Sequence, residues 1–166
     1  MKKLLVILIM FIGTINISAQ ENNEAILQKI DSLQSQLNEL QIDYEFHKLE
    51  SELQRFRLDL ETFCNRVTCG SNEILIACYH GYADKELYES YKNAYDSRVY
   101  LLNAFKKNFN VKKESLNLKI NEIKFSYQQL NLIDQSINAL NATFDTAEHS
   151  LNRYKTTMSM YKDLIR

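Results

Sequence analysis

The chain contains no proline and no tryptophan, and only three of its 166 residues are glycine. Proline and glycine form most of the turns that separate short strands in sandwiches, barrels and α/β folds. A chain this poor in both residues is not divided into many short elements, so we expect an all-α fold with a few long helices. Glycine-rich phosphate loops are excluded for the same reason.

An excess of charge of one sign is also absent, because 20 Lys and Arg residues stand against 21 Asp and Glu residues. Nucleic acids and anionic lipid surfaces attract clusters of basic residues, so we predict no nucleic-acid partner. The histidines His47, His80 and His149 are scattered, each without a Ser or Cys nucleophile in a fitting context. We therefore predict that the protein is not an enzyme and carries no cofactor and no metal.

The first 19 residues have the three parts of a secretory signal peptide. Lys2 and Lys3 form a basic start, the run Leu4–Ile12 is apolar, and Ala19 is a small residue at the cleavage position. The apolar run is shorter than the ~20 residues that a membrane-spanning helix needs. We therefore predict cleavage after Ala19, secretion across a bacterial inner membrane to the periplasm or the cell exterior, and no membrane span in a single domain of residues 20–166.

The second half of the chain has an apolar or aromatic residue at every seventh position, as in a coiled coil. One frame contains Leu116, Ile123, Leu130, Ile137, Phe144, Leu151, Met158 and Ile165. The same frame extends back through Tyr88, Tyr95, Leu102 and Phe109. Long helices with such a row of residues, here called a seam, are stabilised mainly by packing against other helices.

The first half of the chain carries two seams instead of one. Residues Ile26, Ile30, Leu33, Leu37, Leu40 and Tyr44 alternate in steps of four and three. A second series with the same alternation contains Phe46, Leu49, Leu53, Phe56, Leu60, Phe63 and Val67. The two series are out of phase by two residues, so we expect the helix to meet a different neighbour along each of them.

Two turns divide the predicted helices. The segment Thr68–Asn72 is expected to be a turn, because Gly70 can take the left-handed conformation that ends a helix. A second turn is expected near Asn110, and together the two turns predict an elongated antiparallel bundle of three long helices. The predicted helices cover about 21–68, 72–109 and 111–166. In the alternative fold, one helix runs from about Asp84 to Arg166, giving a helical hairpin with a very long C-terminal helix that oligomerises.

The three cysteines cluster around the first predicted turn. Disulfides are the default state of cysteines in an oxidising compartment. A hairpin centred near residue 71 brings Cys64 opposite Cys78, so we predict a disulfide between them and leave Cys69 as a free or interchain thiol. A zinc site formed by these cysteines and His80 is disfavoured, because paired Cys-x-x-Cys spacing is missing.

Six tyrosines lie between residues 79 and 100, and their spacing divides them into two groups. Tyr88, Tyr91 and Tyr95 follow the seam at helical spacing. We expect these three to pack in the core, with hydroxyls that reach the surface of a thin bundle. Tyr79, Tyr82 and Tyr100 are less tied to the seam, so they form the candidate binding surface.

These observations predict an exported, non-catalytic helical protein that acts as a structural or protein-interaction module of the bacterial envelope. Its partner is unidentified, and a second copy of the chain is one candidate. The combination of signal peptide, length and long helices resembles the Skp class of periplasmic chaperones, and this resemblance implies an alternative function as a holdase for unfolded envelope proteins. That class is strongly basic and has a strand-built trimerisation body, whereas this chain has neither feature.

Overall fold

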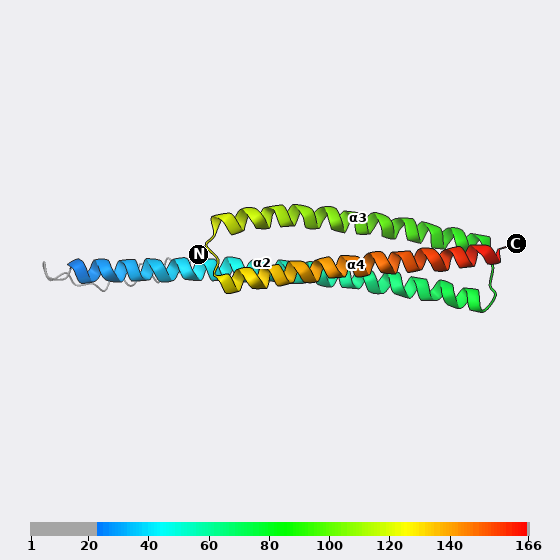
Figure 1. Cartoon of the computed structure of the whole chain (residues 1–166), viewed down its shortest axis with the longest axis horizontal. Helices are drawn as coiled ribbons and strands as arrows, with labels where there is room; N and C mark the ends of the chain where they lie inside the picture. The colour runs from blue at the N-terminus through cyan, green and yellow to red at the C-terminus, as the bar shows by residue number, and fades with distance from the viewer. Residues whose placement is uncertain (1–22, 166) are drawn as a thin grey trace. The chain divides into compact units, whose positions relative to one another are not determined.

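In the computed structural model, three α-helices account for almost all of the described residues, which are 23–165 (Figure 1). The helices are α2 (Asn23–Tyr79), α3 (Lys85–Glu122) and α4 (Tyr127–Leu164). The predicted signal peptide, residues 1–19, lies outside the described residues. The predicted all-α fold with three long helices is confirmed.

The chain divides into two compact units, Met1–Gln41 and Ile42–Arg166. In the first unit the structure describes only the beginning of α2. The second unit is a bundle that combines the rest of α2 with α3 and α4, which lie side by side in Figure 1. None of the described helices is both long enough and apolar enough to cross a membrane.

Helices that follow one another along the chain are antiparallel in the bundle. Two ion pairs join α2 to α3: Lys119 Nζ lies 3.2 Å from Glu45 Oε2, and Lys112 Nζ lies 3.6 Å from Glu52 Oε2. A third, between Lys106 and Glu148, joins α3 to α4. The two pairs made by Lys112 and Lys106 are exposed, and such pairs contribute only about 0–1 kcal/mol each, so they report the helix register more than they stabilise it.

Apolar residues from all three helices fill the core of the bundle. The α2 residues of the second predicted series, from Phe46 to Val67, are all buried. Rings of Phe56, Phe109 and Phe144, one from each helix, lie within 5.4–6.2 Å of one another between centroids. Side chains that bury most of their surface in this way each contribute roughly 1.5–3 kcal/mol, so this shared core is what holds the three helices together.

The first predicted turn is wrong, because α2 continues without a break through Thr68–Asn72. Gly70 and Ser71 are buried there and continue the core face of the helix. The chain instead turns between His80 and Asp84, where Gly81 has a φ of 68° that favours glycine. The Asp84 side chain then caps α3 by accepting from the backbone N–H groups of residues 86 and 87.

The second predicted turn is also wrong, because Asn110 lies inside α3. Phe109 and Leu116 are both buried, so the core face of α3 passes through this segment without interruption. The turn comes later, at residues 123–126, and Ser126 begins α4 through a capping box with Gln129. The alternative single helix from Asp84 to Arg166 is excluded by the same turn, and the helix bounds given above replace the predicted ranges.

Candidate functional site

A group of polar and aromatic side chains lies inside the bundle near the end of α4. Tyr154 of α4 is 1% exposed, and its hydroxyl donates to the carbonyl oxygen of Tyr91 at 3.2 Å. The same hydroxyl accepts from Arg98 Nη1 at 3.2 Å, while the Arg98 Cζ atom lies 4.8 Å from the centre of the Tyr154 ring. The Arg98 guanidinium therefore contacts Tyr154 both as a hydrogen-bond donor and as a cation over the ring.

Small residues of α2 make room for this group. A Cβ atom on Gly70 would lie 2.8 Å from Tyr154 Cε2 and 2.9 Å from Arg98 Nη2. The next residue, Ser71, is fully buried and shares a hydrogen bond of 3.2 Å with the Thr157 hydroxyl. The glycine thus serves close packing in the middle of a helix, and the sequence pattern alone suggested the wrong role for it.

Burial changes the acidity of two tyrosines in this group. Burial raises the pKa of the Tyr154 hydroxyl above its ordinary value, and the charge and hydrogen bond of Arg98 oppose that rise without cancelling it. Burial also raises the pKa of Tyr91, with smaller contributions led by the neighbouring Tyr161. Both side chains therefore stay neutral at physiological pH, where they act as hydrogen-bonding core residues.

A shallow groove of about 400 Å³ opens next to this group. Its lining includes the side chains of Arg66, Cys69, Glu73 and Arg98. The groove thus combines two guanidinium groups, one carboxylate and one thiol. No histidine belongs to the lining formed by the described residues, so Cys69 has no imidazole there to act as its base. The arrangement is an open surface depression with charged side chains in its lining.

The predicted Cys64–Cys78 disulfide is not present, and all three cysteines are free thiols. Both residues lie on α2, fourteen positions apart, which corresponds to about 21 Å along a helix. A disulfide requires Cα atoms within about 7 Å of each other. The pairing depended on the predicted turn at Thr68–Asn72, and it fails because that turn does not exist.

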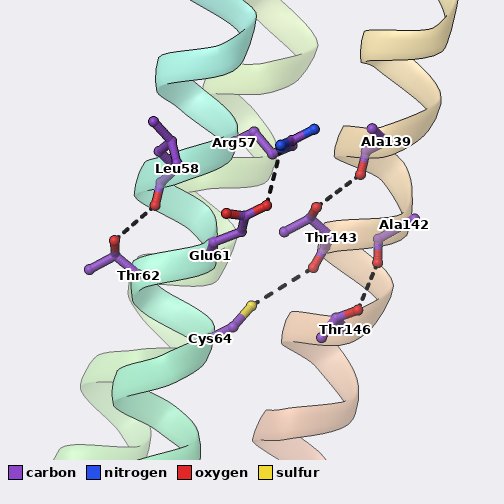
Figure 2. A network of polar contacts seen from close by, with 9 residues as sticks. All are labelled: Arg57, Leu58, Glu61, Thr62, Cys64, Ala139, Ala142, Thr143 and Thr146. Atoms are coloured by element: carbon purple, nitrogen blue, oxygen red, sulfur yellow. Dashed lines mark hydrogen bonds and ion pairs between the residues drawn. The ribbon is translucent and has the colours of Figure 1, made fainter.

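Cys64 instead faces α4, as Figure 2 shows. Its Sγ atom lies 3.9 Å from the carbonyl oxygen of Thr143, a weak contact within hydrogen-bonding range for sulfur. Burial raises the pKa of the Cys64 thiol, and burial also raises that of the half-buried Cys78. Cys69 is exposed. The three thiols therefore differ strongly in their accessibility.

The candidate binding tyrosines are all exposed, but they do not form one patch. Tyr79 and Tyr82 are 89% and 68% exposed and lie beside the α2–α3 turn, on either side of His80. The His80 ring is 5.8 Å from the Tyr79 ring and 6.2 Å from the Tyr82 ring. Tyr100, also exposed, belongs to the middle of α3. The structure thus brings together an aromatic cluster at the turn and leaves Tyr100 apart from it.

A larger exposed apolar surface lies in the first unit. Along α2, the side chains of Ile30, Leu33, Leu37 and Leu40 are 49%, 42%, 41% and 58% exposed. Together with the half-exposed Ile26 they form one row at four- and three-residue spacing, which we call the exposed seam. Single exposed leucines are common on proteins, whereas a continuous row of exposed apolar side chains is unusual. The sequence shows this row, but spacing alone does not distinguish a covered seam from an uncovered one.

No three His, Cys, Asp or Glu side chains among the described residues lie close enough together to hold a metal ion. Among the described residues, the candidate sites that remain are the exposed seam and the groove beside Arg98. A comparison of the chain with protein-family models, with curated proteins and with solved structures finds no match.

Proposed function

We propose that this chain is an exported, non-catalytic helical protein that acts as a protein-interaction module of the bacterial envelope. The observation that carries the proposal is the exposed seam on the first unit. A heptad-like row of leucine and isoleucine contributes nothing to folding while it faces water. Each of these half-exposed side chains would contribute roughly 1 kcal/mol when a partner helix covered it. The row therefore fits binding by helix packing.

The remaining surface supports a binding role rather than a chemical one. The polar groove is open and lacks a paired nucleophile and base, and the buried tyrosines are joined to one another and to Arg98 within the core. The balanced charge of the chain gives no reason to expect a nucleic-acid partner. Binding through an apolar helix face requires neither a paired nucleophile and base nor an excess of basic residues.

A photo-crosslinking amino acid placed in the seam tests the proposal in living cells. At Leu37, which lies on the exposed seam, we expect light-dependent adducts with a defined partner. At Ser35, which is exposed on the opposite side of the same helix turn, we expect none. Absence of any adduct at Leu33, Leu37 and Leu40 would overturn the proposed interaction role, because these positions lie at the centre of the surface.

Export is tested separately by the mature protein's N-terminus. If the signal peptide is cleaved as proposed, intact-mass measurement and N-terminal sequencing will find Gln20 as the first residue of protein taken from the periplasm or medium. Retention of Met1 on cytoplasmic protein would contradict export while leaving the seam proposal unaffected.

A holdase function is the second candidate, and the exposed apolar seam together with the exposed Tyr79 and Tyr82 is the observation that favours it. Unfolded chains bind to such surfaces through many weak apolar contacts. A holdase should suppress the aggregation of an unfolded client protein at near-stoichiometric amounts, and it should lose this ability when Leu33 and Leu37 are both changed to glutamate. An interaction module with one folded partner shows no suppression in either form.

A further inference from the structure

We infer that the partner of the exposed seam is a second copy of this chain, an inference that rests on the proposed interaction role. The seam is the longest row of exposed apolar side chains at helical spacing in the described part of the chain. A second copy brings an identical row with identical spacing. Every layer of the seam can then face a layer of the same kind, which is the arrangement that knobs-into-holes packing requires.

The heptad positions of the seam residues fit a helical pair. With Ile30 and Leu37 at the first core position (a) of each heptad, Ile26, Leu33 and Leu40 fall at the second (d). Isoleucine at a with leucine at d, as in Ile30 and Leu33, is the combination that favours two-stranded coiled coils, whereas Leu37 at a and Ile26 at d are choices also found in larger assemblies. All five seam residues lie on one helix, α2, which runs from Asn23 to Tyr79.

The residues that flank the seam argue against a strongly charged partner. The flanking positions (e and g) from residue 27 to residue 41 are Leu27, Lys29, Gln34, Gln36 and Gln41. In coiled coils these positions select the partner through their charges. With one lysine among neutral residues, these positions could form few ion pairs with an acidic or basic partner helix.

A second copy is electrostatically compatible in both orientations. In a parallel pair, Lys29 lies opposite Gln34 of the other copy, and no like charges meet. In an antiparallel pair whose layers join Leu37 to Leu33, Gln36 lies opposite Gln36 of the other copy, and within the first unit no like charges meet. Neither orientation therefore carries a charge repulsion that would reject self-association.

The test is the solution mass of the mature chain, residues 20–166, measured by sedimentation equilibrium between about 1 and 100 µM. We expect the wild-type chain to associate with itself over this range. The variant L33E/L40E places a carboxylate in two core layers and should weaken self-association at least about tenfold. The matched control Q28E/S35E adds the same charges, also seven residues apart, on the opposite side of the helix, and it should associate like the wild type.

Helicity and urea unfolding of each variant show whether the bundle itself remains folded. A wild-type chain that stays monomeric at 100 µM would overturn the inference, as would an L33E/L40E variant that associates normally. These failures are distinct from failure of the interaction role. Cellular crosslinks from Leu37 to a protein of a different mass would retain that role and assign the seam to another partner, whereas crosslinks at twice the chain's mass support the second copy.

Discussion

Gly70 of α2 lies so close to the ring of Tyr154 in α4 that a Cβ atom at Gly70 would come within 2.8 Å of Tyr154 Cε2. The ring cannot easily retreat, because Tyr95 stacks beside it at 6.0 Å and Arg98 lies over it. Real Cβ atoms do not approach other heavy atoms this closely. The glycine is therefore a condition for the contact of Arg98 with Tyr154, and this contact joins α3 to α4 directly beside α2.

Replacing Gly70 with alanine should destabilise the bundle even though alanine is the better helix former. The higher helix propensity of alanine stabilises by about 1 kcal/mol, whereas overpacking of a tight core site destabilises by about 1–3 kcal/mol. We expect a net loss of about 1 kcal/mol in the free energy of unfolding, measured by urea titration. The exposed Ser97→Ala substitution on α3 is the control and should stay within about 0.5 kcal/mol of wild type. A Gly70→Ala variant more stable than wild type would show that the ring moves freely.

Removing the Tyr154 hydroxyl should weaken the bundle and alter its response to alkaline pH. Tyr154→Phe loses the hydrogen bonds to Arg98 and to the Tyr91 carbonyl, which together contribute about 1–2 kcal/mol. The folded-state pKa of Tyr154 is raised, so its contribution is complete below the unfolded value of about 10 and is lost as the pH rises through the higher folded value. The stability difference between wild type and variant should therefore shrink between pH 8 and pH 11.

Urea unfolding at these two pH values measures the difference, with Tyr79→Phe as the control. The Tyr79 ring is 89% exposed, so losing its hydroxyl should not change stability at either pH. Equal losses for wild type and Tyr154→Phe on going from pH 8 to pH 11 would mean that Tyr154 does not titrate with unfolding. Tyr91 remains in both proteins, and burial, the main cause of its raised pKa, is common to both, so most of its contribution cancels in the comparison.

The core faces could be predicted from the sequence, but the turns could not. The series from Phe46 to Val67 is buried as its spacing predicted, and Tyr88, Tyr91 and Tyr95 pack against the core from half-buried positions. Both predicted turns were misplaced for a physical reason. Gly70 ends no helix because its missing side chain is needed for packing, and a glycine's sequence context does not distinguish these two uses.

The second turn was hidden by the regularity of the seven-residue frame. Leu116 before the turn is buried, and Ile123 and Leu130 on either side of its centre are half-buried, so the frame continues through a break in the helix. A periodic pattern cannot reveal a turn that preserves its phase. The informative residues were Ser126 and Gln129, whose spacing fits a capping box and whose side chains bond to each other's backbone N–H groups.

The contact between Arg98 and Tyr154 could not be predicted from the sequence. Arg98 and Tyr154 are 56 residues apart, and their meeting depends on where the α3–α4 turn falls. A shift of the turn by a few residues would pair Arg98 with a different part of α4. The seam of the first unit could be predicted as a pattern, whereas its exposure required knowing which helices cover which faces.

The three thiols should react at clearly separated rates. Cys69 is exposed and should react first with Ellman's reagent, followed by the half-buried Cys78. Cys64 should react only when the chain unfolds, because burial both shields its sulfur and raises its pKa, which lowers the fraction of reactive thiolate. Counting released thiols in native buffer and then in urea checks this order. The geometry of α2 would be contradicted if fewer than three thiols were counted in urea without a reducing agent and if mass spectrometry found a peptide linked through Cys64 and Cys78.

Ser126→Ala should destabilise the start of α4 and, through it, the bundle. The Ser126 hydroxyl accepts from the Gln129 backbone N–H at 3.2 Å, and the Gln129 side chain accepts from the Ser126 N–H at 2.9 Å. Loss of a serine N-cap destabilises by about 1 kcal/mol. Gln128→Ala, at an exposed position of the same turn, is the matched control and should have little effect on the urea midpoint. If both variants unfold at the wild-type midpoint, the first turn of α4 is frayed in solution and the capping box does not set where the helix begins.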